Sequence, residues 1–294
     1  MVHVSIKHFE YFRARSIEEA TSLLEKFGEE AKLVAGGTDL VPQLKARETK
    51  PGCLVDIGEI KDLDYIEDFR GGLRIGAVTT HNTLERSSLV ASRSLALAEA
   101  ARGVGNVQIR NLGTIGGNLA NASPAADTAP PLIVSGASLK ILGPGKERLV
   151  PAEDFFTSVN RTVLQTNELL AEIQIPSPPV NTGEAFMKLG RRAGPDLAIA
   201  SAAATVTVED NMCRDIRLAL GSVAPTPLRA RKTEDFLRGE QLEGRIIEEC
   251  SQIVAKEIKP ISDVRASAEY RTDIAKFLVR NAVQTAISRT GSRR

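Results

Sequence analysis

Residues 108–127 have the sequence QIRNLGTIGGNLANASPAAD, which is rich in glycine, alanine and asparagine. A segment with so few large side chains gives up core packing, and an extended ligand lying along its exposed N–H groups would compensate for that loss. Thr114, Asn118 and Ser123 would then supply polar contacts. The alternative is a glycine-rich loop on the surface, and the residues of this stretch alone leave that alternative open.

A second pair of glycines lies upstream, in the segment Val34-Ala35-Gly36-Gly37-Thr38-Asp39-Leu40. Residues 32–35 are typical of a short strand and a helix can begin near Leu40, so this pair forms a strand-to-helix turn. Consecutive N–H groups in such a turn favour an anion, and a pyrophosphate fits it. The spacing matches neither the dinucleotide-binding fingerprint nor the P-loop. A tight turn without a ligand explains one such pair equally well, but two pairs in one domain indicate two ends of one long cofactor.

The elements around these turns predict an α+β protein of two domains. Ser16 and Glu19 form a capping box before a helix that ends at Gly28, and strands are expected at residues 53–57, 73–77, 138–142, 148–150 and 169–175. The prolines at positions 176, 178 and 179 can continue neither a helix nor a central strand, so the domain boundary is placed there. Beyond it, strands at 185–189, 199–208 and 216–220 and helices at 246–259 and 270–288 predict a small sheet followed by helices.

Composition narrows the function classes. The net charge of +1 argues against a dedicated nucleic-acid binder. Cys53, Cys213 and Cys250 lie too far apart in sequence for a zinc or iron–sulfur site built from short loops, so we expect free thiols and no metal. We expect the protein to be cytoplasmic. Its thiols are expected to be free, its N-terminal residues are charged and do not resemble a signal peptide, and it has no long apolar run. His81, next to Thr80, is expected to have a helix-cap or surface role rather than a catalytic one.

Four segments together resemble the medium subunits of molybdenum hydroxylases, the xanthine dehydrogenase and CO dehydrogenase type. The turn at residues 35–39 and the loop at residues 110–118, with Ser123, Pro124 and Asp127, are similar to the two FAD-binding signatures of that family and stand in its order. Residues 188–198 and 221–230 resemble two stretches of the family's C-terminal domain. The likeness covers nearly the whole chain.

The resemblance implies a two-part FAD-binding domain of the vanillyl-alcohol-oxidase and p-cresol-methylhydroxylase (PCMH) type at residues 1–176, with subdomains of about 1–57 and 58–176. A CO dehydrogenase flavoprotein C-terminal-like domain with a three-stranded antiparallel sheet would follow at 180–290. The turn from Ala35 to Leu40 and part of the 114–118 loop would hold the FAD pyrophosphate, Ser123 and Asp127 would reach the ribityl or adenosine portion, and the segment from Lys188 to Leu197 would lie near the isoalloxazine ring. The full set of expected FAD-binding residues is Lys32, Ala35, Gly36, Gly37, Thr38, Asp39, Leu40, Gly113, Thr114, Ile115, Gly116, Gly117, Asn118, Ser123, Asp127, Lys188 and Leu197.

The family's function implies electron transfer rather than substrate chemistry, so no catalytic residue is expected on this chain. A large subunit with the molybdenum cofactor acts on the substrate, a small subunit carries two 2Fe–2S clusters, and FAD on the medium subunit exchanges electrons with a terminal acceptor: NAD, a quinone, oxygen or a ferredoxin. A dimer of such heterotrimers is expected. Two alternatives are a free-standing FAD-dependent oxidoreductase and a non-redox nucleotide-binding scaffold that only holds a phosphate.

Overall fold

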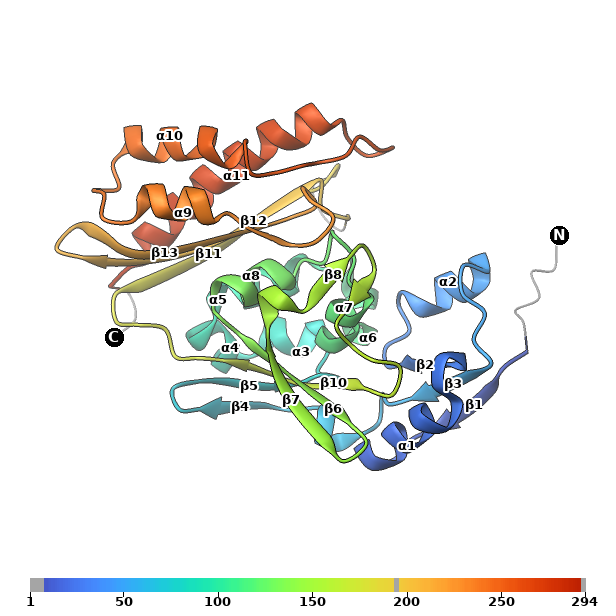
Figure 1. Ribbon diagram of the computed structural model, residues 1–294. Helices are drawn as coiled ribbons and strands as arrows, with labels where there is room; N and C mark the ends of the chain where they lie inside the picture. The colour runs from blue at the N-terminus through green and yellow to red at the C-terminus, as the bar shows by residue number, and fades with distance from the viewer. Residues whose placement is uncertain (1–7, 193–195, 292–294) are drawn as a thin grey trace.

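The computed structural model describes residues 8–192 and 196–291, which form two lobes and a C-terminal layer (Figure 1). The first lobe is a parallel sheet in the order β1-β3-β2, formed by β1 (Glu10–Arg13), β2 (Ala31–Val34) and β3 (Cys53–Asp56). Helices α1 (Ile17–Phe27) and α2 (Leu40–Ala46) accompany it. The Ser16 hydroxyl accepts from the Glu19 N–H and caps α1, as predicted, while the Glu19 carboxylate accepts from the Arg15 N–H.

The second lobe is a five-stranded antiparallel sheet in the order β4-β5-β10-β6-β7. Its strands are β4 (Ile66–Phe69), β5 (Gly72–Gly76), β6 (Ser138–Gly143), β7 (Lys146–Pro151) and β10 (Leu169–Ile175). Six short helices belong to this lobe: α3 (His81–Arg86), α4 (Ser88–Arg93), α5 (Leu95–Gly103), α6 (Val107–Leu112), α7 (Ile115–Asn121) and α8 (Ala129–Val134). A small hairpin of β8 (Phe156–Ser158) and β9 (Arg161–Thr162) precedes β10.

The C-terminal layer is an antiparallel sheet in the order β11-β12-β13-β14, with helices above it and the second lobe below it (Figure 1). The three predicted strands are β11 (Thr182–Leu189), β12 (Ala200–Glu209) and β13 (Met212–Gly221), and a two-residue strand, β14 (Leu228–Arg229), adds a fourth. The helices are α9 (Arg231–Leu237), α10 (Gly244–Val254) and α11 (Ala268–Ser288).

The C-terminal layer is joined to the second lobe by a shared core and by ionic contacts. Ala203 and Ala219 of its sheet belong to the same buried cluster as the residues of α5 and α8. Arg289 pairs with Glu99 of α5 at 2.6 Å, and the Glu99 carboxylate accepts from the backbone N–H of Phe186 at 2.9 Å. The layer is therefore held close to the segments that carry the second glycine-rich stretch.

The predicted α+β class is confirmed, and the local predictions hold best where the apolar periodicity is strong. The glycine-rich region after residue 103 contains three short helices, α6, α7 and α8, whose bounds the sequence patterns did not predict. Helix α10 ends at Val254, several residues before its predicted end. Within the described residues, no helix has the length and apolarity needed to cross a membrane.

Candidate functional site

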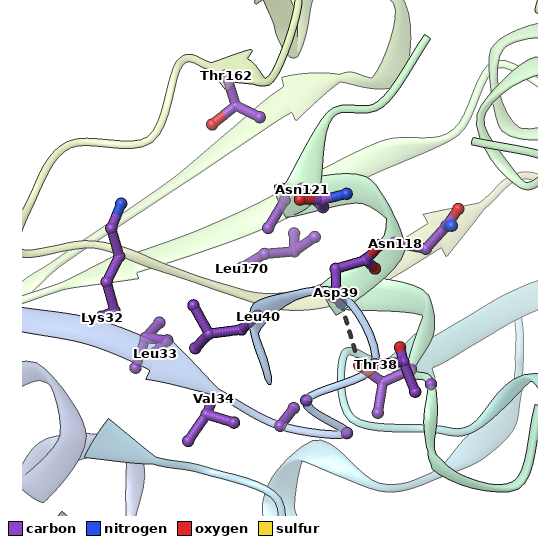
Figure 2. A pocket seen from close by; sticks show the side chains of 18 of the residues that line it. Lys32, Leu33, Val34, Thr38, Asp39, Leu40, Asn118, Asn121, Thr162 and Leu170 are labelled. Carbon is purple, nitrogen blue, oxygen red and sulfur yellow. Dashed lines mark hydrogen bonds between the residues drawn. The ribbon is translucent and has the colours of Figure 1, made fainter. Parts of the chain in front are cut away.

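A cavity of about 1130 Å³ runs between the two lobes. Known small-molecule pockets have volumes of about 300–1,000 Å³, so this cavity suits a large, extended ligand. Its walls come from the turn after β2, the start of α7, the β8–β9 hairpin with the loop that follows it, and residues 104–109. Figure 2 shows Lys32 and Leu33 on one side of this space and Thr38 and Asn118 on the other.

The structure brings most of the predicted binding residues to this one cavity. Fourteen of them line it: Lys32, Ala35, Gly36, Gly37, Thr38, Asp39, Leu40, Gly113, Thr114, Gly116, Gly117, Asn118, Asp127 and Leu197. The other three, Ile115, Ser123 and Lys188, do not. Ile115 is fully buried in the core of the second lobe, the Ser123 hydroxyl accepts from the Ala125 N–H, and Lys188 lies behind Asp127.

The two glycine turns meet backbone to backbone at the cavity wall. A Cβ atom on Gly36 would overlap the carbonyl oxygen of Leu112, directly before Gly113. Gly37 has a φ of +66°, a conformation that glycine adopts without strain. A Cβ atom on Gly116 would lie 2.6 Å from the carbonyl oxygen of Ala77, so α7 packs closely on the end of β5. Close approach of the backbone between the lobes thus requires Gly36, close packing within the second lobe requires Gly116, and the positive φ favours glycine at position 37.

Backbone donors without partners mark the place where the turns meet. The N–H groups of Gly36, Gly37, Thr38, Asp39 and Thr114 find no acceptor among the described residues. The Thr114 hydroxyl accepts from the Gly117 N–H at 3.1 Å and so fixes the start of α7. Donors concentrated at a cavity wall fit an anionic ligand such as a pyrophosphate.

A buried ion pair closes the end of the cavity near the C-terminal layer. The Asp127 Oδ2 atom lies 2.6 Å from the Lys188 Nζ atom, which also donates to the carbonyl oxygen of Gly103 at 2.9 Å. The Asp127 Oδ1 atom is buried and has no partner. Burial raises the pKa of Asp127 to about 6, although the Lys188 ammonium opposes the rise. Asp127 therefore presents an unused acceptor atom, and Lys188 holds its carboxylate in place.

Several residues that line the cavity were not among the predicted ones. Leu170, the β8–β9 residue Thr162 and His81 all lie on its walls. Gln43 of α2 donates to the side chain of Asn121 of α7 at 3.3 Å, a hydrogen bond that links the lobes. The surface role considered for His81 is wrong, because this residue starts α3 beside its N-cap, Thr80, and only 2% of it is exposed. No local sequence signal distinguishes Thr162 or Leu170 from other strand residues.

Comparison with known proteins gives matches over nearly the whole chain. Residues 7–178 match the family described as "FAD binding domain in molybdopterin dehydrogenase", and residues 184–286 match the "CO dehydrogenase flavoprotein C-terminal domain". The carbon monoxide dehydrogenase medium chain of Afipia carboxidovorans is 37% identical over 281 residues, covering 96% of this chain and 97% of that protein. The xanthine dehydrogenase FAD-binding subunit of Escherichia coli is 32% identical over 287 residues, covering 96% and 97% of the two chains.

Solved structures agree with the sequence matches. A chain of carbon monoxide dehydrogenase from Hydrogenophaga pseudoflava superposes with a TM-score of 0.94 at 36% identity, covering 98% of this chain and 100% of that one. A chain of quinoline 2-oxidoreductase from Pseudomonas putida gives a TM-score of 0.91 at 29% identity, covering 99% and 100%. Both domains thus have close structural counterparts in oxidoreductases.

Proposed function

Because the chain belongs to the family of FAD-binding medium subunits of molybdenum hydroxylases, we propose that it is the electron-transfer subunit of such a complex. In this role it passes electrons between the 2Fe–2S clusters of a small subunit and a terminal acceptor. A large subunit with the molybdenum cofactor acts on the substrate, and the subunits form a dimer of heterotrimers in the cytoplasm. The observation that carries the proposal is the cavity between the lobes, with its five unpartnered N–H groups.

The cavity residues fit FAD, and we assign each group a part in holding it. The turn from Ala35 to Leu40 and residues 114–118 hold the pyrophosphate, because five N–H groups of these two segments, those of Gly36, Gly37, Thr38, Asp39 and Thr114, lack partners among the described residues. Asp127 accepts from a hydroxyl or ring N–H group of the cofactor through its free Oδ1 atom. Lys188 and Ser123 act from behind the wall, and Leu197 covers the open end. FAD supplies the redox chemistry, since a flavin can accept electrons one at a time and release two.

The same assignment divides the chain into two domains. We propose that residues 1–176 form the FAD-binding domain, with its subdomains at about 1–57 and 58–176, and that residues 180–290 form the C-terminal domain. Lys188 comes from the C-terminal part but contacts Asp127 and Gly103 of the second lobe. The C-terminal domain therefore supports the cofactor site as well as covering the second lobe.

An apolar rim beside the cavity supports contact with a partner subunit. Val107, Leu112 and Leu197 are 46%, 60% and 50% exposed. Leu197 lines the cavity, and Leu112 directly precedes the Gly113 turn on its wall. Large apolar side chains grouped around a site are typical of interaction surfaces. A partner that covers this rim would bring its clusters close to the bound cofactor.

Purification of the tagged chain from the cells that make it tests the proposed complex. We expect iron and molybdenum to co-purify with it. Leu112→Glu places a charge on the rim, so co-purified iron should fall at least about tenfold while the FAD content stays unchanged. Leu149→Glu is the matched control, because Leu149 is 57% exposed on β7, away from the cavity.

Rapid mixing tests the direction of electron flow. Adding the chemically reduced iron–sulfur subunit to the FAD-loaded chain should bleach the flavin absorption. A wild-type chain that contains FAD but recovers no iron or molybdenum, and whose absorption is unchanged by the reduced subunit, would instead be a free-standing flavoprotein.

A further inference from the structure

His81 lies at the point where the two glycine turns meet. Its backbone N–H donates to the carbonyl oxygen of Gly113 at 3.0 Å, and Thr80 forms a β-bridge with Thr114. A Cβ atom added to Gly113 would lie 3.3 Å from the His81 Cδ2 atom and 3.3 Å from the Thr38 hydroxyl. The imidazole therefore contacts the second turn and lies near a side chain of the first, and it lines the cavity.

The His81 ring has unused hydrogen-bonding capacity inside the protein. The side chain is nearly fully buried, and its Nδ1 atom finds no partner. Neither ring nitrogen has a hydrogen bond within residues 8–192 and 196–291. Burying a polar group without a partner is unfavourable, so such groups are usually satisfied by water or by a ligand. A ligand in the cavity can supply the hydrogen-bond partner that this ring lacks.

The ring is uncharged at neutral pH. Burial, together with the nearby guanidinium of Arg110, lowers the pKa of His81 to about 4. A neutral imidazole has one N–H group and one lone pair. Because no acceptor lies at Nδ1, the tautomer with its hydrogen on Nε2 avoids burying an unpaired N–H group. The Nε2 atom then becomes a hydrogen-bond donor.

We propose that His81 is a further cofactor-binding residue, a neutral donor from Nε2 to the FAD pyrophosphate. The neighbouring unpartnered groups, the N–H groups of Gly36 to Asp39 and Thr114, are also donors, so the wall around His81 is built for oxygen acceptors. Arg110 does not take this place, because its guanidinium is paired with Glu85 at 2.8 Å. The inference rests on the proposed function.

Titration of the apo chain with FAD tests the assignment. His81→Leu removes both nitrogens, and the Kd for FAD should rise about tenfold, as expected for the loss of a hydrogen bond to a charged group. His81→Gln restores an N–H donor near the position of Nε2 and should bring the Kd back to within about threefold of wild type. The unfolding temperature of each apo variant is the control for a change in folding.

The outcomes separate this inference from the proposed function. A wild-type chain that binds no FAD would end the proposed function itself. Wild-type binding with an unchanged Kd for His81→Leu, or equal weakening by the Leu and Gln variants, overturns the role of His81. If His81→Leu does not fold, ¹⁵N-histidine labelling of the wild type decides. FAD should then shift the His81 ring resonances while those of the exposed His8 stay in place, and unshifted His81 resonances would also overturn the assignment.

Discussion

Gly36→Ala should abolish stoichiometric FAD binding, with an affinity loss of at least about 100-fold. The new methyl group would overlap the carbonyl oxygen of Leu112, which is backbone and cannot rotate away. The two lobes must then separate at the place where their turns meet. Because Gly36 does not have a positive φ, the effect is purely steric and does not include backbone strain. Separation of the turns disperses the N–H groups that face the pyrophosphate.

Fluorescence titration of the apo variant with FAD measures this loss. Gly244→Ala is the control, since a Cβ atom at that position, the first residue of α10, meets nothing within 4 Å. The control should bind FAD like the wild type. If Gly36→Ala also binds FAD with wild-type affinity, the contact between the turns does not shape the cofactor site.

Lys188→Met should lower the free energy of unfolding by about 3–5 kcal/mol at about pH 8, as expected when a buried charge loses its ion-pair partner. The Asp127 carboxylate is buried at the cavity wall, and Lys188 pairs with it from behind at 2.6 Å. Methionine fills a similar volume, so the loss of charge dominates. The carbonyl oxygen of Gly103 also loses its donor, which loosens the segment before the second glycine stretch.

The loss in the free energy of unfolding should shrink as the pH falls. This direction of the pH dependence identifies the unpaired Asp127 carboxylate as the cause. Burial already raises the pKa of Asp127 to about 6, and removing the lysine, which lowers it, raises it further. In the unfolded chain Asp127 loses its proton above its ordinary pKa, near 4, whereas in the folded variant it keeps the proton up to the raised pKa. Between these two pKa values the folded state binds more protons, so the free energy of unfolding decreases as the pH rises. Urea unfolding at about pH 5 should then recover much of the loss seen at about pH 8.

A surface lysine provides the control for this pair. Lys276 pairs with Asp273 at 3.4 Å, and the Asp273 side chain is 73% exposed. Lys276→Met should change the free energy of unfolding little at either pH, because exposed ion pairs contribute little. An equal loss at both pH values for Lys188→Met would show that lost packing, rather than the unpaired Asp127 charge, destabilises the variant.

The sequence predicted those elements that are specified by a few neighbouring residues, such as a helix cap or a glycine turn. Helix α1 has its cap at Ser16 and its C-terminal glycine at Gly28, and both occupy the expected places. The turn at Gly36 was found because a strand pattern, two glycines and a helix start follow one another. The resemblance to the medium subunits of molybdenum hydroxylases is confirmed by the family matches of both domains.

Other elements depend on contacts between distant segments. Helix α7 contains two glycines and so has little intrinsic helix propensity, yet it forms because Thr114 caps it and Gly116 packs against Ala77. Strand β1 has only four residues, two aromatic ones between two charged ones, and so shows no alternation; it pairs in parallel with β3 more than forty residues away. The cavity wall at Thr162 and Leu170 likewise arises only when the hairpin and β10 line the same cavity as the turn after β2.

The visible absorption spectrum of the purified chain, followed by acid release of its cofactor, tests the proposed FAD site. We expect flavin bands and one FAD released per chain, because one extended cavity carries both glycine turns. Absence of flavin, even after reconstitution with FAD and the partner subunits, would contradict it. The turns would then hold only a phosphate-bearing ligand without redox chemistry.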